Sequence, residues 1–451
     1  MKYFFYSYLL TVCLALCSCS GSDYVNAIPD GSTALISIDM KKMAADNPNG
    51  GNILKSLLQT DNAEDCGIDL TSKIYLFESA EGNLGLCAKV NSESDLKSWL
   101  DKLAQKSVAQ KTTERKGFTF TTLNGSWVVG FSSKALLVMG PVVGAAQAQM
   151  QLQMAKYLDA DEDHGIKGAP IYEKIDSMES GMAMVAQVQA LPEKMMAPFT
   201  IGAPKDADAS QVLIAAEMAV KGGCLNIEGQ TFSFNKQINQ ALSEAAKVYR
   251  PIQGRYTASM PANALMGMFV NVDGQQYIKL LQSNKGMQAL LAGINAAIDM
   301  DNIIRSVNGD MSIVIPSYSD DDLQLSMAAQ LANKAWTEDV DYWKQSCPKG
   351  GKISDWQKDA WTYSDGKTSF CFGVTADNQF YSGNSQERAL ASIQNATQPL
   401  PQQVRKLIDG KKMAMIFNLA GLTGGKQEVT TVTSLLNPLF GNIKAIVYSI
   451  K

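Results

Sequence analysis

The chain contains a single histidine, His164, and this limits the acid-base chemistry that its residues can perform. Histidine has the unperturbed pKa closest to neutrality and is the usual proton carrier in nucleophilic triads. A Ser-His-Asp, Cys-His or multi-histidine metal site would therefore have to use His164. This residue lies in the acidic stretch 159–165, which is typical of a surface loop. We therefore expect a protein that is not an enzyme.

The same stretch places three carboxylates, those of Asp159, Asp161 and Asp163, at alternate positions. Oxygen ligands at this spacing open the calcium-binding loop of an EF-hand, so Ca²⁺ is the one cofactor that the sequence suggests. The later positions of such a loop do not match, because the sixth is His164 instead of glycine and the twelfth is Pro170 instead of glutamate. We favour a solvated acidic loop, with a calcium site as the alternative.

Four of the six tryptophans lie between residues 336 and 361, where they could form an aromatic platform for a sugar ring. Trp343 and Trp361 have aromatic residues at the matching places of the first half of the chain, so core packing accounts for them. Trp336 and Trp356 have no such counterparts. These two are our candidates for contact with a glycan.

Signatures of phosphate and nucleic-acid binding are missing from the sequence. Gly366-Lys367-Thr368 resembles the end of a phosphate loop, but position 361, where that loop requires glycine, holds tryptophan. No G-x-G-x-x-G motif supports a dinucleotide fold. With 40 basic against 44 acidic residues, the chain also lacks the positive charge that a phosphate backbone attracts. Nucleic acid is therefore not an expected partner.

Two charge-poor stretches, 144–155 and 287–307, are the last candidates for a functional surface. The first places Ala146, Met150 and Met154 at helical spacing. Flexible methionine side chains adapt to varied apolar partners, including lipid. Core packing is the more ordinary explanation for such stripes, and we favour it.

The first residues of the chain predict export and lipid attachment. Residues 1–18 combine a basic Lys2 with an apolar stretch too short to span a bilayer, as in a secretion signal. Residues 16–19 resemble a bacterial lipobox, and Cys19 fits the acylated position better than Cys17, which follows a leucine. Acyl chains such as palmitate would anchor the protein. Residues 19–23 would form a short tether.

Five cysteines follow Cys19, which is an odd number for a disulfide framework. Loops of similar length separate two pairs of them, but sequence spacing does not show which thiols are close. No C-x-x-C pair indicates a zinc site. The five are Cys66, Cys87, Cys224, Cys347 and Cys371.

An internal duplication is the main architectural prediction. Similar short segments occur in the same order in both halves of the chain. One such match could arise by chance, but several in the same order indicate a repeat. The matched segments are Ile28-Pro29 with Met260-Pro261, Asp95 and Trp99 with Asp339 and Trp343, Gly130 with Gly373, and Met182-Ala183-Met184 with Met413-Ala414-Met415. We predict two tandem units, 24–250 and 251–451.

Each predicted unit reads as an α+β arrangement. Runs of neighbouring strands are interrupted by single helices, which favours a largely antiparallel sheet with packed helices. A polar residue, Ser92 or Ser94, is expected to cap a helix in the first unit. Asn124-Gly125 and Asp365-Gly366 are typical of tight hairpin turns, because both dipeptides favour a positive φ.

Several of these features together resemble a known family. The lipobox, the opening Tyr24-Val25-Asn26-Ala27-Ile28-Pro29, the strand ending in Ile38-Asp39 and the two-unit length are similar to the Bacteroidetes lipoproteins grouped as domain of unknown function 4836. The resemblance covers the whole mature chain but consists of scaffold motifs. It implies an envelope address and carries over no catalytic residue.

The sequence therefore predicts an outer-membrane lipoprotein that acts as a non-enzymatic binding or scaffolding module, held at the membrane by its N-terminal lipid. Two alternatives remain open, a glycan-binding surface lipoprotein and a periplasm-facing carrier of apolar cargo. A glycan or another envelope protein would be its partner, and the sequence leaves the side of the membrane open.

Overall fold

The computed structural model describes residues 21–46, 63–191, 196–295, 298–317, 324–419 and 443–450. The chain divides into two compact units, Met1–Ala186 and Gln187–Lys451. The predicted lipidation site, Cys19, and the predicted signal segment lie outside the described residues. No described helix is both long and apolar enough to cross a bilayer.

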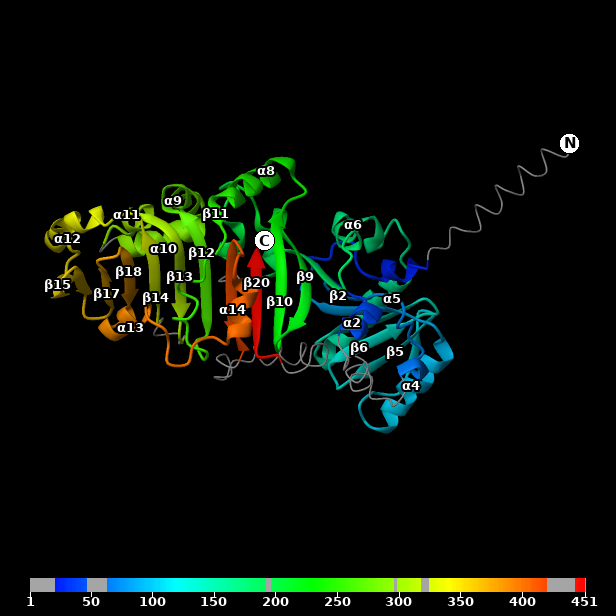
Figure 1. The fold of residues 1–451 in the computed structure, drawn as a ribbon. Coiled ribbons are helices and arrows are strands. Elements are labelled where there is room, and N and C mark those ends of the chain that lie inside the picture. Colours follow the sequence, from blue (N-terminus) through cyan, green and yellow to red (C-terminus); the bar gives the residue numbers. More distant parts are fainter. Residues whose placement is uncertain are drawn as a thin grey trace. The chain divides into compact units, whose positions relative to one another are not determined.

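The first unit is built on an antiparallel sheet with the strand order β8-β1-β2-β3-β7-β6-β5-β4. Figure 1 labels β2, β5 and β6 of this sheet. In β6 and β7 consecutive residues are buried, so both faces of these strands are covered, which explains their long apolar runs. The bounds of the strands are β1 (Ala34–Ile38), β2 (Ile74–Glu78), β3 (Leu84–Lys89), β4 (Thr113–Arg115), β5 (Phe118–Leu123), β6 (Trp127–Phe131), β7 (Ala135–Gly140) and β8 (Met182–Gln187).

Helices of the first unit follow the sequence signals closely. The hydroxyl of Ser92 accepts a hydrogen bond from the backbone N–H of Asp95 and so caps the longest of them, as one of the two predicted serines was expected to do. Its buried face carries Leu96, Leu100 and Leu103. The helices are α2 (Met40–Asp46), α4 (Glu93–Gln105), α5 (Gln147–Leu158) and α6 (Pro170–Asp176), with short 3-10 turns η1 (Asp23–Ala27), η2 (Ala63–Cys66), η3 (Gly144–Ala146) and η4 (Ile166–Gly168).

The second unit has the strand order β9-β10-β20-β19-β12-β13-β14-β18-β17-β16-β15, with β11 paired to the end of β12. Every pairing is antiparallel except that of β10 with β20. The bounds are β9 (Leu213–Lys221), β10 (Cys224–Phe232), β11 (Tyr249–Arg250), β12 (Met266–Asp273), β13 (Val307–Ile315), β14 (Ser326–Leu331), β15 (Lys352–Gln357), β16 (Ala360–Ser364), β17 (Ser369–Val374), β18 (Gln379–Gly383), β19 (Met413–Asn418) and β20 (Ala445–Ile450).

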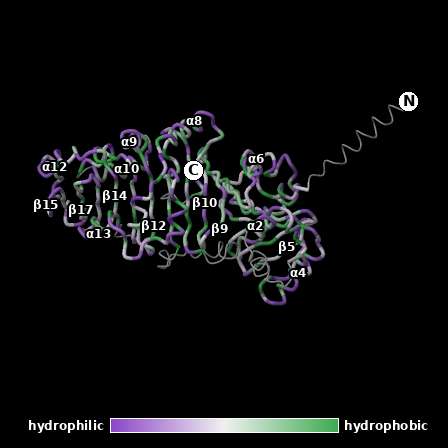
Figure 2. Tube along the Cα trace, viewed as in Figure 1, coloured by the Kyte–Doolittle hydropathy of each residue, from purple (hydrophilic) through white to green (hydrophobic). Residues whose placement is uncertain are grey.

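Helices pack on this second sheet and connect its strands. They are α8 (Lys236–Ala245), α9 (Gly274–Ser283), α10 (Lys285–Asn295), α11 (Met300–Arg305), α12 (Val340–Ser346), α13 (Gln386–Ala391) and α14 (Gln402–Ile408), with 3-10 turns η5 (Val188–Ala190), η6 (Ala197–Thr200), η7 (Ala209–Gln211), η8 (Ala246–Val248) and η9 (Ala335–Asp339). Figure 2 shows hydrophobic and hydrophilic residues mixed along strands and helices alike, as expected for elements with one buried face.

One pattern of strand order occurs in both units. The order β8-β1-β2-β3-β7-β6-β5-β4 matches β19-β12-β13-β14-β18-β17-β16-β15 when the strands are numbered along the chain. A backbone hydrogen bond recurs as well, from Ile166 N to Ile28 O and from Leu400 N to Met260 O, each 3.0 Å long. The α+β class with a mostly antiparallel sheet is therefore confirmed.

The compact units divide at residue 186, whereas the sequence predicts a boundary at 250. Strands β9 and β10, which the prediction assigns to the first unit, pair with each other, and β10 pairs with β20. Residues 224–229 and 445–450 therefore form one continuous ladder. Because the partner strand lies at the far end of the chain, sequence order alone gives no sign of this pairing.

Candidate functional site

A pocket of about 370 Å³ lies between α14 and the strands β10, β20 and β19 of the second sheet. This volume falls in the range of small-ligand sites. Its apolar lining consists of Cys224, Ala262, Leu400, Pro401, Val404, Ile416 and Ala445. The remaining lining residues are Gly222, Asn263, Gln403, Asn418 and Lys444.

The floor of this pocket is formed by three adjacent strands. Ala445 of β20 is paired with Asn418 of β19 on one side and with Cys224 of β10 on the other. Residues paired directly across a ladder project from the same face, and Ile416 lies two residues from Asn418 on that face. Because Cys224 and Ala445 are small, this part of the sheet leaves space beneath the helix.

The roof comes from α14 and the residues that lead into it. Val404 is 5% exposed and belongs to the core cluster that also contains Leu400 and Ile416. The chain before the helix is held to the segment that precedes β12 by the bond from Leu400 N to Met260 O and by a bridge between Pro261 and Pro399. The pocket is therefore continuous with the hydrophobic core and has walls fixed by backbone hydrogen bonds.

Lys444 is the only charged residue in the described part of the lining, and it is exposed at the mouth. Its backbone is held by the bonds from Lys444 N to Gly223 O and from Leu419 N to Lys444 O. Cys224 is 2% exposed, and burial raises the pKa of its thiol although the nearby Lys444 ammonium opposes the shift. A protonated, buried thiol is a poor nucleophile. The described lining is thus suited to an apolar molecule, and no acid is paired with a base among its residues.

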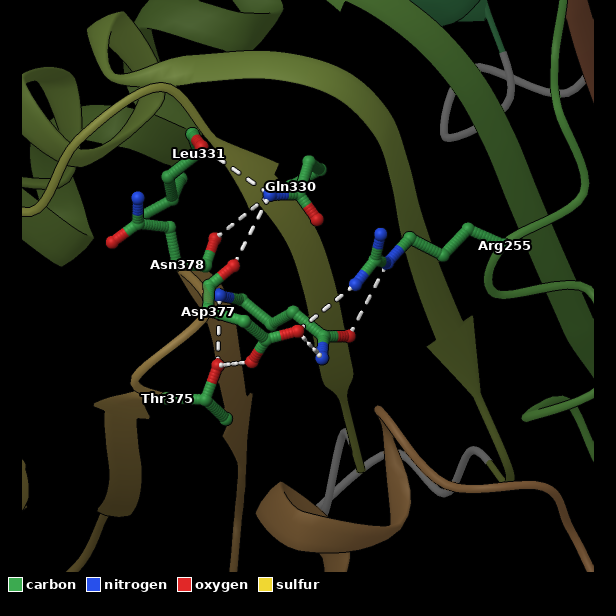
Figure 3. Close-up of polar contacts among 7 residues, drawn as sticks. Arg255, Gln330, Leu331, Thr375, Asp377 and Asn378 are labelled. Atoms are coloured by element: carbon green, nitrogen blue, oxygen red, sulfur yellow. Dashed lines mark hydrogen bonds and ion pairs between the residues drawn. The ribbon is translucent and has the colours of Figure 1, made fainter.

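A second cluster of polar residues lies where β14 and β18 meet the segment before β12 (Figure 3). The Arg255 guanidinium pairs with Asp377 at 3.2 Å and donates to the side-chain oxygen of Gln379 at 3.4 Å. The Thr375 hydroxyl donates to Asp377 at 2.6 Å. This hydrogen bond, helped by Gln379 and Arg255, lowers the pKa of the Asp377 carboxyl. Because both partners of the ion pair are well exposed, we interpret the cluster as a surface ion pair that contributes little to the free energy of unfolding.

Beneath that cluster, Asp310 of β13 anchors the same segment from inside. Its buried carboxylate accepts hydrogen bonds from the backbone N–H groups of Gln253 and Arg255, and from the Asn271 amide at 2.9 Å. These hydrogen bonds of the carboxylate therefore hold the segment before β12, and β12 itself, against β13. The arrangement explains the local fold and requires no ligand.

The acidic loop predicted as a calcium site lies exposed in the first unit between α5 and α6. Asp161 accepts a hydrogen bond from the His164 ring at 2.7 Å and another from the backbone N–H of Asp163. The pairing lowers the pKa of Asp161 and raises that of His164. Asp159 and Asp161 border a hollow of about 400 Å³ that also contains Lys134.

Within the described part of the chain, no group of three or more histidine, cysteine, aspartate or glutamate side chains is arranged to hold a metal ion. Asp159, Asp161 and Asp163 are thus not gathered around one point in this conformation. A calcium site at this loop stays a prediction from the sequence.

Trp336, the first predicted glycan residue, is a core side chain. It is 1% exposed and stacks on Trp343 with ring centroids 6.0 Å apart and planes 5° from parallel. Trp361, Phe372 and Phe380 surround the remaining faces of its ring. A sugar cannot reach this indole, because neighbouring aromatic rings bury it. Trp336 is therefore a core residue although the first half of the chain has no aromatic counterpart for it.

The second predicted glycan residue, Trp356, lies half-buried on β15. Its indole N–H donates to the carbonyl of Trp361 at 3.1 Å, and its ring meets that of Tyr381 edge-on. It also packs against the small core cluster of Ala360 and Ala389. Most of its contacts are thus internal, and glycan binding at this position stays a prediction.

In both charge-poor stretches, apolar side chains among the described residues face the core. Met150 and Met154 of α5 are buried, as are Met300, Ile303 and Ile304 at the end of the second stretch. The five described cysteines are free thiols, so Cys66 and Cys87 form no disulfide in this structure, and neither do Cys347 and Cys371.

Comparison with known proteins identifies the family. The family model for the domain of unknown function DUF4836 matches residues 41–397, so the chain belongs to this family. No curated protein matches the sequence. Two solved structures of TP0453 align with it at 9% identity: crystal form III covers 82% of this chain and 97% of that one with a TM-score of 0.26, and crystal form I covers 87% and 99% with a TM-score of 0.27.

None of the pocket residues was identified as a site from the sequence. Cys224 was noticed only as part of an odd count of cysteines, and Lys444 lies in a stretch without a motif. The pocket depends on β10 and β20, which are far apart in the chain, and a parallel pairing between such strands leaves no local pattern.

Proposed function

We propose that this protein is a non-enzymatic binding protein of the bacterial envelope and that its ligand is a small apolar molecule held in the pocket under α14. The observation that supports this most directly is a concave site lined mainly by apolar side chains and continuous with the core. The only histidine lies in the first unit, on the exposed acidic loop and outside the lining of this pocket. Binding without chemical turnover is therefore the simplest role for the site.

Binding of a neutral apolar fluorophore tests this proposal. Full-length protein carrying Cys19→Ser, which removes any acyl chain of its own, is titrated with N-phenyl-1-naphthylamine. We expect a saturable rise in fluorescence that Val404→Trp weakens by about tenfold or more, because the indole occupies the pocket. Ala445→Leu is a second filling variant with the same expected direction.

Gln402→Trp is the matched control for the helix. It adds the same ring to α14 at an exposed position that does not line the pocket. Equal binding by the two tryptophan variants, or no saturable binding by any of them, would show that the pocket is not the binding site.

The envelope address is part of the same proposal, with Cys19 as the lipidated residue in a Bacteroidetes outer membrane. The lipobox-like residues 16–19 and the short apolar stretch before them support it. Labelling cells with an alkyne analogue of palmitate tests the attachment. Cys19→Ser should abolish the label, whereas Cys17→Ser should leave the protein acylated.

We infer further that the strands β1 to β8 and β12 to β19 descend from one duplicated unit. The support is the common strand order together with the sequence matches around Pro29 and Pro261. An experimental structure in which these two sets of strands fail to superpose would rule out this origin.

A further inference from the structure

We propose that the ligand of this pocket is a single-chain fatty acid, with its alkyl chain under α14 and its carboxylate beside the Lys444 ammonium. This inference rests on the proposed function, because it names the chemical class that the same pocket would select.

Charge supports an anionic ligand. Among the described residues of the lining, Lys444 is the only charged one, and none of them is acidic. An apolar molecule with one negative end would therefore place that end at the mouth and its tail on the floor formed by Cys224, Ala445 and Ile416. A neutral ligand would gain no charge interaction with this ammonium.

The type of cation favours a carboxylate over a phosphate monoester. Phosphate monoesters carry close to two negative charges and are held best by the paired donors of arginine or by several cations. The described lining contains no arginine and one lysine. One ammonium at an exposed mouth matches a group with a single charge.

The size of the pocket favours one alkyl chain. Its volume, about 370 Å³, lies near the lower end of the range for small-ligand sites. The amides of Asn263, Gln403 and Asn418 supply polar groups, and Asn418 already donates to the Ala262 carbonyl. The apolar lining can thus cover a single alkyl chain, while the carboxylate lies at the solvent-exposed mouth beside Lys444.

Displacement of the naphthylamine probe from the Cys19→Ser protein tests the class of ligand. Saturated fatty acids of increasing length are compared with the alcohols of the same length at neutral pH. Affinity should rise about fourfold for each added CH₂ until the pocket is full, since a buried CH₂ contributes about 0.8 kcal/mol. The acid should bind more tightly than the matched alcohol.

Lys444→Gln separates the charge from the apolar contacts. It should weaken binding of the acids by roughly threefold to fivefold, which is the range of an exposed ion pair, and leave the alcohols unchanged. Lys352→Gln, at an exposed position on β15 outside the pocket, is the control and should change neither. Added salt should reduce the advantage of the acid over the alcohol.

Each alternative outcome is distinct. Equal binding of acid and alcohol, or an equal effect of Lys444→Gln on both, overturns the fatty-acid assignment but leaves an apolar site. Tighter binding of lysophosphatidic acid, a single-chain phosphate monoester, than of the fatty acid overturns it in favour of a phosphate-bearing lipid. Failure of the probe and of both ligand series to bind overturns the proposed function itself.

Discussion

The space beneath α6 is filled by side chains, whereas the space beneath α14 is open. Each helix nevertheless follows a β-bridge to a proline. In the first unit, Pro29 bridges Gly165 and α6 packs on β1. The ring of Tyr172 then meets Tyr75 with centroids 6.0 Å apart, and Tyr24 meets Tyr75 at 6.3 Å. In the second unit, α14 packs on β20, and the pocket lies between them.

The difference shows how one strand order can enclose either a filled or an open interior. The helix of the first unit lies over a strand of the repeated order, where three tyrosine rings occupy the space. By contrast, α14 lies over β20, which stands outside that order and presents small side chains at Ala445 and, through β10, at Cys224. Small side chains at the added strands therefore account for the open space beneath α14.

The largest expected effect comes from opening the filled interior. Tyr75→Ala should lower the free energy of unfolding by about 3–5 kcal/mol, because a ring that is 2% exposed leaves a cavity beneath its neighbours. Chemical denaturation of the full chain measures the change. Tyr342→Ala removes a ring that is 69% exposed, and should be nearly neutral. Similar losses for the two variants would show that the tyrosine cluster does not support the first unit.

Adding volume tests the comparison from the other side. Ala183→Leu, on β8 and fully buried, should destabilise the protein by about 1–3 kcal/mol, because no space is free for the added atoms. Ala445→Leu should cost less than about 1 kcal/mol, since its added atoms enter the pocket. Denaturation midpoints of the two single variants give the answer. A larger cost at Ala445 would mean that the pocket is not open to a side chain.

A matched pair of hydroxyl deletions sharpens the comparison further. Tyr24 and Tyr256 both precede the proline of their unit by five positions. The Tyr24 hydroxyl donates to the Lys73 carbonyl at 2.5 Å, whereas the Tyr256 hydroxyl is buried without a hydrogen-bond partner among the described residues. Tyr24→Phe should cost about 1 kcal/mol, and Tyr256→Phe should be nearly neutral. The same denaturation measurement checks both, and the opposite order would contradict the assigned hydrogen bonding.

Local features of the fold were readable from the sequence, whereas the pocket was not. Asn124 and Gly125 both adopt a positive φ at the predicted hairpin, and Ser92 caps the predicted helix. Such signals involve neighbouring residues. Trp336 was misjudged because its partners come from several other elements, and the pocket depends on a parallel pairing between strands at distant places in the chain.

The smallest expected effect concerns the loop before α6, whose acidic residues include Asp161. The hydrogen bond and charge of Asp161 raise the pKa of His164 above its ordinary value of 6.5. Because the folded-state pKa is the higher one, the pairing stabilises the fold fully below about pH 6.5 and loses this contribution as the pH rises through the raised pKa. The Asp161 pKa is lowered, so its share is lost when the pH falls through that lowered value.

Nuclear magnetic resonance can follow this titration without an assignment problem, because the chain has one histidine ring. Asp161→Asn should return the pKa of His164 toward 6.5, whereas Asp163→Asn should shift it less, since Asp163 acts on the ring only through its charge. Asp161 and His164 are fully exposed, so the free energy of unfolding should hardly change as either group titrates. Equal shifts in the two variants would mean that general acidity of the loop, and not the bond to Asp161, sets the histidine pKa.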